Sequence, residues 1–98
     1  MKVRLTGEAE RALEGIGVTI AERNPARALS FVREIRDRCM SLASFPNRFP
    51  LVPRFESQGV RHLVHGNYLV FYRVEPDAVV ILTILHGAMD YAEHLDLL

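Results

Sequence analysis

The stretch that decides the fold is HGNYLVFYRV, residues 65–74. Gly66-Asn67 is typical of a tight two-residue hairpin turn, and the residues after it are almost all aromatic, β-branched or leucine. We therefore predict that Tyr68–Val74 is a strand that pairs with Val60–His65 across the turn. Arg73 lies near the end of this strand. Three roles are open for Arg73: a catalytic cation, a contact to a partner, or the polar end of a core strand. Which role it has decides whether the chain is an enzyme or a binding protein.

The two-residue turn also predicts which side chains share a face of the hairpin. If Gly66-Asn67 is the whole loop, His65 lies opposite Tyr68 and Arg61 lies opposite Tyr72. One face then carries Arg61, Leu63, His65, Tyr68, Val70 and Tyr72. The other face is largely apolar and carries Val60, His62, Val64, Leu69, Phe71 and Arg73.

The segments on either side of this hairpin predict two helices and two more strands. Residues 2–6 alternate apolar and polar side chains, which predicts a short strand. Thr6 and Asn24 are good N-cap residues, and Pro25 suits the first position of a helix, so we expect two helices in an antiparallel hairpin. The run Ala78–His86 is apolar on both faces, which indicates a central strand that is covered on both sides.

The remaining segments are a loop and a tail. Residues 46–53 contain three prolines, and the apolar side chains in and around them predict that this loop packs on the core. The tail after Gly87 is expected to be a short helix or an arm, with Tyr91 packed on the domain. The predicted fold is α+β: an N-terminal strand, an antiparallel helical hairpin and a three-stranded antiparallel meander, in a single domain spanning 1–98.

Composition limits the kinds of partner. The chain has 12 basic and 12 acidic residues and a formal net charge of zero, which disfavours nonspecific nucleic-acid binding. A single cysteine, Cys39, excludes an intrachain disulfide. The sequence shows no metal-site spacing and no phosphate-cradling loop, so we expect no cofactor and no metal. We see no secretion signal and no apolar run long enough for a membrane span, and we therefore expect a cytoplasmic protein.

Four arginines of the second predicted helix are a candidate basic patch: Arg27, Arg33, Arg36 and Arg38. A solvated helix face is the alternative that we favour. Two opposite-charge pairs at a spacing of four residues support it, Glu34–Arg38 and Arg33–Asp37.

Three segments together resemble the ParE/RelE superfamily of toxins from type II toxin–antitoxin systems: AERNPARA, GNYLVFYRV and LHGAMD. The resemblance covers nearly the whole chain and is greater to the ParE branch than to the RelE branch. It implies a cognate antitoxin that holds the toxin inactive by wrapping around it. It also implies a target, since ParE-like toxins are associated with DNA gyrase and RelE-like toxins cut mRNA on the ribosome.

The nuclease alternative needs a proton acceptor, a proton donor and cations that stabilise the charge on phosphate. By the resemblance, Leu69 and Met89 stand where RelE-type nucleases carry arginines, and His62 falls on a lysine position. Losing one charge-stabilising donor typically lowers the rate by about 10²–10³. The remaining candidates for catalysis are His62, Arg73 and His86.

We therefore expect a ParE-like toxin that binds DNA gyrase and is neutralised by an antitoxin, with nucleic acid involved only indirectly. The apolar hairpin face is expected to be open and to bind the antitoxin. On this hypothesis, Phe71→Asp or Leu69→Asp weakens binding without unfolding the domain. A ribosome-dependent endoribonuclease and a family member that binds its antitoxin but is inactive remain the alternatives.

Overall fold

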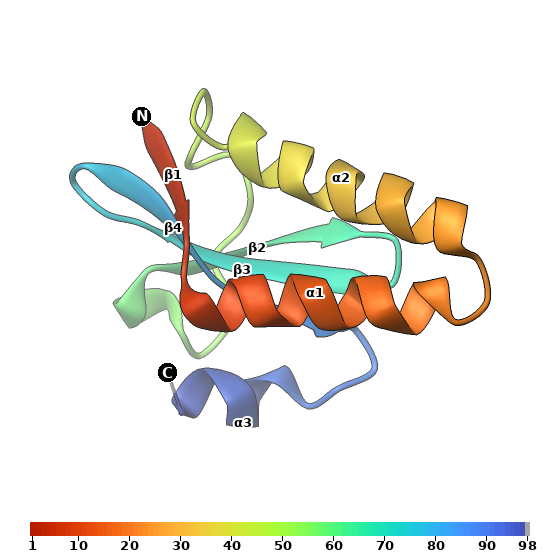
Figure 1. Cartoon of the computed structure of the whole chain (residues 1–98). Helices are drawn as coiled ribbons and strands as arrows, with labels where there is room; N and C mark the ends of the chain where they lie inside the picture. The colour runs from red at the N-terminus through yellow and green to blue at the C-terminus, as the bar shows by residue number, and fades with distance from the viewer. Residues whose placement is uncertain (98) are drawn as a thin grey trace.

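The structure is a computed structural model that describes residues 1–97. Four strands form one sheet in the order β1-β4-β3-β2, in which β1 is parallel to β4 and the other neighbours are antiparallel. The element order confirms the predicted one (Figure 1). Along the chain the elements are β1 (Lys2–Leu5), α1 (Gly7–Ala21), α2 (Pro25–Ser41), a 3-10 helix (Glu56–Gln58), β2 (Val60–His65), β3 (Tyr68–Val74), β4 (Ala78–His86) and α3 (Tyr91–Asp96).

Both helices of the hairpin begin at the cap residues that the sequence predicted. The backbone N–H of Ala9 donates to Oγ1 of Thr6, and the backbone N–H of Arg27 donates to Oδ1 of Asn24, each at 3.1 Å. These bonds satisfy N–H groups that have no partner within the helix. Thr6 Oγ1 also donates to the carbonyl of Leu82 at 2.8 Å, which fixes the start of α1 against the central strand.

The ion pairs of the helical hairpin of α1 and α2 differ from the expected ones. Neither of the two predicted pairs forms among residues 1–97, namely Glu34–Arg38 and Arg33–Asp37. Instead Arg27 pairs with Glu34 two helical turns away, and Arg36 reaches across to Glu10 of α1 with two hydrogen bonds of 3.1 and 3.2 Å. Exposed ion pairs contribute little to stability, so small differences in reach decide which carboxylate an arginine takes.

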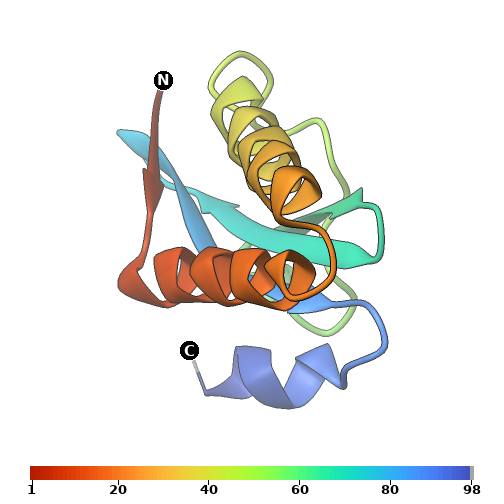
Figure 2. The same ribbon diagram turned by 45° about the vertical axis from the view of Figure 1, so that its right-hand side comes forward.

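Buried side chains form a core on each face of the sheet. The hairpin of α1 and α2 covers one face, where Leu13 and Ile35 pack with Tyr72 and Ile81 of the sheet. Figure 2 shows this hairpin in front of the sheet and α3 apart from it, below α1. The second core includes Phe71, Val80 and Leu85. All of β4 except His86 is buried, which confirms the predicted central strand.

The hairpin of β2 and β3 has the predicted turn and register. His65 pairs with Tyr68 and Arg61 pairs with Tyr72. Gly66 has a φ of +58°, a left-handed backbone conformation that favours glycine at this position of the turn.

The strand β4 contains an irregularity that the sequence did not predict. Phe71 pairs with Thr83, whereas the next residue, Tyr72, pairs with Ile81. Leu82 is therefore one extra residue in β4, which is a β-bulge.

The proline-rich segment lies against the domain, as expected. Oη of Tyr72 donates to the carbonyl of Pro46 at 2.9 Å, and a guanidinium N–H of Arg61 donates to the carbonyl of Phe49 at 2.7 Å. Phe45 is the exception, because 68% of its surface is exposed.

Candidate protein-binding site

The six residues predicted for antitoxin binding share one face of the β2–β3 hairpin, as their register requires. Their accessibility varies widely. Val64 is 54% exposed, whereas Phe71 is only 1% exposed. Val60 is also buried, and the other three are partly exposed: His62, Leu69 and Arg73.

This face is not open in the structure, and the expectation that it would be open is wrong. The ring of Tyr91 in α3 lies over Phe71, with ring centroids 5.4 Å apart. Leu95 of α3 is buried in the same core, as are Val52 and Phe55 of the segment that precedes β2. The predicted packing of Tyr91 on the domain is confirmed. The spacing of four residues between Tyr91 and Leu95 fits a helix that packs both side chains on the sheet, but two positions in so short a segment are a weak sequence signal.

Helix α3 is the weaker part of this cover. It has six residues, its cap residue Asp90 makes no side-chain cap bond, and Leu95 is its only buried residue. An isolated helix of this length is unstable in water, so packing on Phe71 and its neighbours must hold it in place.

Arg73 lies at the rim of this covered face. Its Nε is 3.4 Å from Oε2 of Glu75, and both side chains are partly exposed. A cavity of about 200 Å³ lies beside Arg73 and is lined by Phe55, Gln58, Val60, Leu82, Leu95 and Asp96. Among the described residues, no second arginine or lysine lines this cavity. Arg73 therefore lies at the rim of an apolar surface, and within residues 1–97 it is not part of a cluster of cations around this cavity.

The two histidines of the catalytic alternative do not come together, although Arg73 lies on the same face of the hairpin as His62. His62 is level with Phe71, and His86 is level with Tyr68 two strands away. Three residues along a strand span about 10 Å, so the two imidazoles are well separated. Nδ1 of His86 accepts from the backbone N–H of Ala88 at 3.1 Å, which agrees with the structural role that we favour for it.

His62 has no polar partner for one ring nitrogen. Its Nδ1 is buried and makes no hydrogen bond among the described residues, and its ring lies 6.3 Å from that of Phe71. Burial lowers the pKa of His62, since the charged imidazolium loses solvation.

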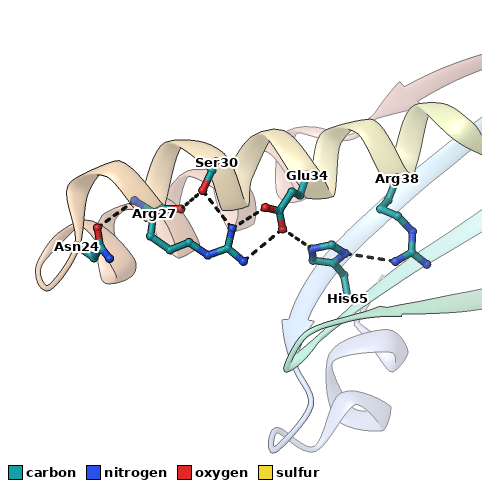
Figure 3. A network of polar contacts seen from close by, with 6 residues as sticks. All are labelled: Asn24, Arg27, Ser30, Glu34, Arg38 and His65. Carbon is teal, nitrogen blue, oxygen red and sulfur yellow. Dashed lines mark hydrogen bonds and ion pairs between the residues drawn. The ribbon is translucent and has the colours of Figure 1, made fainter.

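A polar network that the sequence did not predict ties β2 to α2 (Figure 3). Nε2 of His65 is 3.1 Å from Oε1 of Glu34, and Nδ1 of His65 is 3.3 Å from a guanidinium nitrogen of Arg38. A guanidinium only donates, so Nδ1 accepts and the Nε2–H donates to the carboxylate. Hydrogen bonds from Arg27 and then His65 lower the pKa of Glu34. Both ring nitrogens of His65 are engaged, which leaves no free base.

Other candidate groups have structural explanations. Cys39 is fully buried, and burial raises the pKa of its thiol to about 11, so it is no nucleophile at neutral pH. Within residues 1–97, no three His, Cys, Asp or Glu side chains are placed to hold a metal ion. No helix in the described part of the chain is both long and apolar enough to cross a bilayer.

Comparisons with known proteins place this geometry in context. The sequence profile of a family described as ParE toxin of type II toxin-antitoxin system, parDE, matches residues 3–91. A solved structure described as the chromosomal ParDE TA system from P. aeruginosa is 26% identical with a TM-score of 0.75, and the match covers 88% of this chain and 95% of that chain.

A second solved structure is the toxin–antitoxin complex RelBE2 from Mycobacterium tuberculosis. It is 26% identical with a TM-score of 0.65, and the match covers 90% of this chain and 92% of that chain. No curated protein sequence matches.

The helical hairpin, the sheet order and these structural neighbours define the class, which is that of small α+β domains with the ParE/RelE-like fold. The family profile spans almost all of the sequence, and the chain belongs to the ParE toxin family of type II toxin–antitoxin systems.

Proposed function

We propose that this toxin acts by binding: it inhibits DNA gyrase in the cytoplasm, and direct contact with a cognate antitoxin neutralises it. The observation that carries the proposal is the set of side chains that line the cavity beside Arg73. Its neighbouring cavity holds no second cation among the described residues, whereas cleavage of RNA needs several. Leu69 and Met89 support the same conclusion, because they stand at the positions where the resemblance places nuclease arginines.

An antitoxin partner is supported by the structural neighbours. One is described as a ParDE system and the other as a toxin–antitoxin complex. In this chain we assign the antitoxin contact to the face of β2 and β3 that carries Val64, Leu69 and Arg73. Val60 and Phe71 can contribute only if α3 moves away, because α3 and the segment before β2 bury them.

Expression of the toxin without its antitoxin tests the proposal. We expect growth arrest with DNA damage and intact mRNA, and co-expression of the antitoxin should restore growth. The purified toxin should reduce supercoiling by gyrase, and a preformed toxin–antitoxin complex is the matched control that should not.

Other outcomes would support the alternatives. Rapid mRNA cleavage in a translating extract, with gyrase unaffected, would indicate the ribosome-dependent endoribonuclease. Normal growth with measurable antitoxin binding would indicate an inactive family member.

A further inference from the structure

The helical hairpin carries an apolar groove between α1 and α2. The groove has a volume of about 640 Å³, and side chains that pack toward the sheet, such as Leu13 and Ile35, do not line it. Figure 2 shows both helices in front of the sheet, with no other element of residues 1–97 in front of them. Small and apolar residues form most of the lining: Gly17, Val18, Ala21, Ala28, Leu29 and Val32.

Two large apolar side chains in this groove are exposed to solvent, one from each helix. Val18 of α1 is 58% exposed, and Leu29 of α2 is 70% exposed. A single exposed apolar residue is ordinary, whereas an apolar groove with several of them indicates an interaction surface.

The two walls of the groove carry opposite charges. Glu14 lies on the α1 wall and Arg33 on the α2 wall, and neither makes an ion pair among the described residues. Arg36 also lines the groove, but it is already paired with Glu10. A partner of a single charge sign would match one wall and oppose the other. A surface with both signs on opposite walls suits a copy of itself.

The alignment of the two helices decides whether such a copy fits. In antiparallel helices, each step forward along one helix is a step back along the other. Two contacts between the helices fix their relative position: a Cβ on Gly17 would lie 3.2 Å from Cγ2 of Val32, and Arg36 bonds Glu10. This alignment brings the exposed residues of the groove to nearly the same level in two pairs: Glu14 with Arg33, and Val18 with Leu29.

We propose that a second copy of this chain docks on this groove, in a dimer whose two-fold axis runs along the helical hairpin. Rotation about this axis lays α1 of each copy on α2 of the other, and the four helices form a bundle. Because the paired residues are level, Val18 then meets Leu29 of the second copy. Glu14 likewise meets Arg33 of the second copy, and each of these contacts occurs twice.

The size of the hairpin sets the strength of this dimer. Helix α1 has 15 residues, so it is about 22 Å long, and two neighbouring helices offer a contact surface of about 450 Å². The dimer would bury about 1,000 Å² in total, which is at the lower limit for a specific interface. We therefore expect a dissociation constant of about 1–100 µM. The face that we assign to the antitoxin lies on the other side of the sheet, so the dimer leaves it free.

Sedimentation equilibrium of the full-length toxin without antitoxin tests the proposal. The mean mass should rise from that of one chain toward that of two between about 1 and 500 µM. Val18→Asp and Leu29→Asp should stay monomeric in this range, because each would bury a carboxylate in an apolar contact. Val64→Asp is the matched control on the β2–β3 face, where Val64 is 54% exposed, and it should dimerise like the wild type. All three positions are exposed, so each variant should keep the unfolding temperature of the wild type.

Charge reversal tests the pairing itself. Glu14→Arg brings arginines together across the interface, and Arg33→Glu brings carboxylates together. Each variant alone should therefore self-associate at least about tenfold more weakly than the wild type. An equal mixture of the two variants restores both pairs of opposite charge, so it should dimerise with nearly the wild-type affinity.

Three results would overturn the inference. The first is a wild-type toxin that remains monomeric at about 500 µM. The second is a mixture of Glu14→Arg and Arg33→Glu that associates no better than either variant alone. The third is an equal loss of dimerisation for Val64→Asp and Val18→Asp. If the wild type is monomeric and Val18→Asp lowers the affinity for the antitoxin in calorimetry, the groove belongs to the antitoxin instead.

Discussion

Tyr72 is the largest side chain that the protein buries completely, and its hydroxyl group needs a partner in the core. Oη donates to the carbonyl of Pro46 at 2.9 Å, and burial raises the pKa of Tyr72, so the phenol stays neutral and able to donate. Tyr72→Phe removes the hydroxyl donor and leaves the carbonyl of Pro46 without this hydrogen bond. We expect the free energy of unfolding to fall by about 0.5–1.5 kcal/mol, measured by urea denaturation.

Tyr68→Phe is the control for this prediction. Tyr68 lies on the same face of β3, but its hydroxyl makes no hydrogen bond among the described residues. Its removal should change the free energy of unfolding by no more than about 0.5 kcal/mol. Equal losses in the two variants would show that the bond to Pro46 contributes nothing to stability.

At the scale of the element, local signals in the sequence predicted the strands, the turn and the helix starts. Thr6, Asn24 and Gly66 act within a few residues of themselves, which is why a single sequence reveals them. The predicted faces of β2 and β3 hold for the same reason, since a two-residue turn fixes the register.

Long-range packing accounts for what the sequence did not reveal. The partners of Glu34 come from another turn of α2 and from β2, so a rule based on spacing within one helix missed them. The cover over Phe71 comes from α3, a six-residue helix without a side-chain cap, which leaves little local signal. The sequence predicted that the segment with Val52 and Phe55 packs on the core, but not that the backbone of Arg54 between them has a positive φ of 76°.

The cover also changes which substitution can map the antitoxin contact on β2 and β3. We expect Phe71→Asp to unfold the domain, because it buries a carboxylate in a core position that is 1% exposed. Val64→Asp is the better probe, since Val64 is 54% exposed on the same face. It should weaken antitoxin binding by about tenfold or more in calorimetry while the unfolding transition stays near that of the wild type.

Val18→Asp on α1 is the matched control, because Val18 is an equally exposed valine on the helical hairpin. Its antitoxin affinity should equal that of the wild type. Unchanged affinity for Val64→Asp, or an equal loss for both variants, would contradict the assignment of the contact to the β2–β3 face.

At the scale of the whole molecule, the two cores share one sheet, so a group buried against the sheet affects the stability of both. A domain of this size buries a limited apolar surface and is only marginally stable. The imidazole of His62 packs on Phe71, and its Nδ1 has no hydrogen-bond partner among residues 1–97. Protonation of His62 in the folded state would place a charge at this poorly solvated position.

Global stability should therefore fall as the pH decreases from 7 to 5. The folded-state pKa of His62 lies below its unfolded value near 6.5, so the unfolded chain binds more protons in this range. The stabilisation is complete above the unfolded pKa and is lost as the pH falls through the folded pKa. The carboxylates with lowered pKa values, Glu10 and Glu34, lose their contribution only at more acidic pH. His62→Gln should reduce the dependence of the urea midpoint on pH between 7 and 5, whereas His86→Gln at an exposed position should change it less. Identical pH profiles for His62→Gln and the wild type would show that another group controls acid stability.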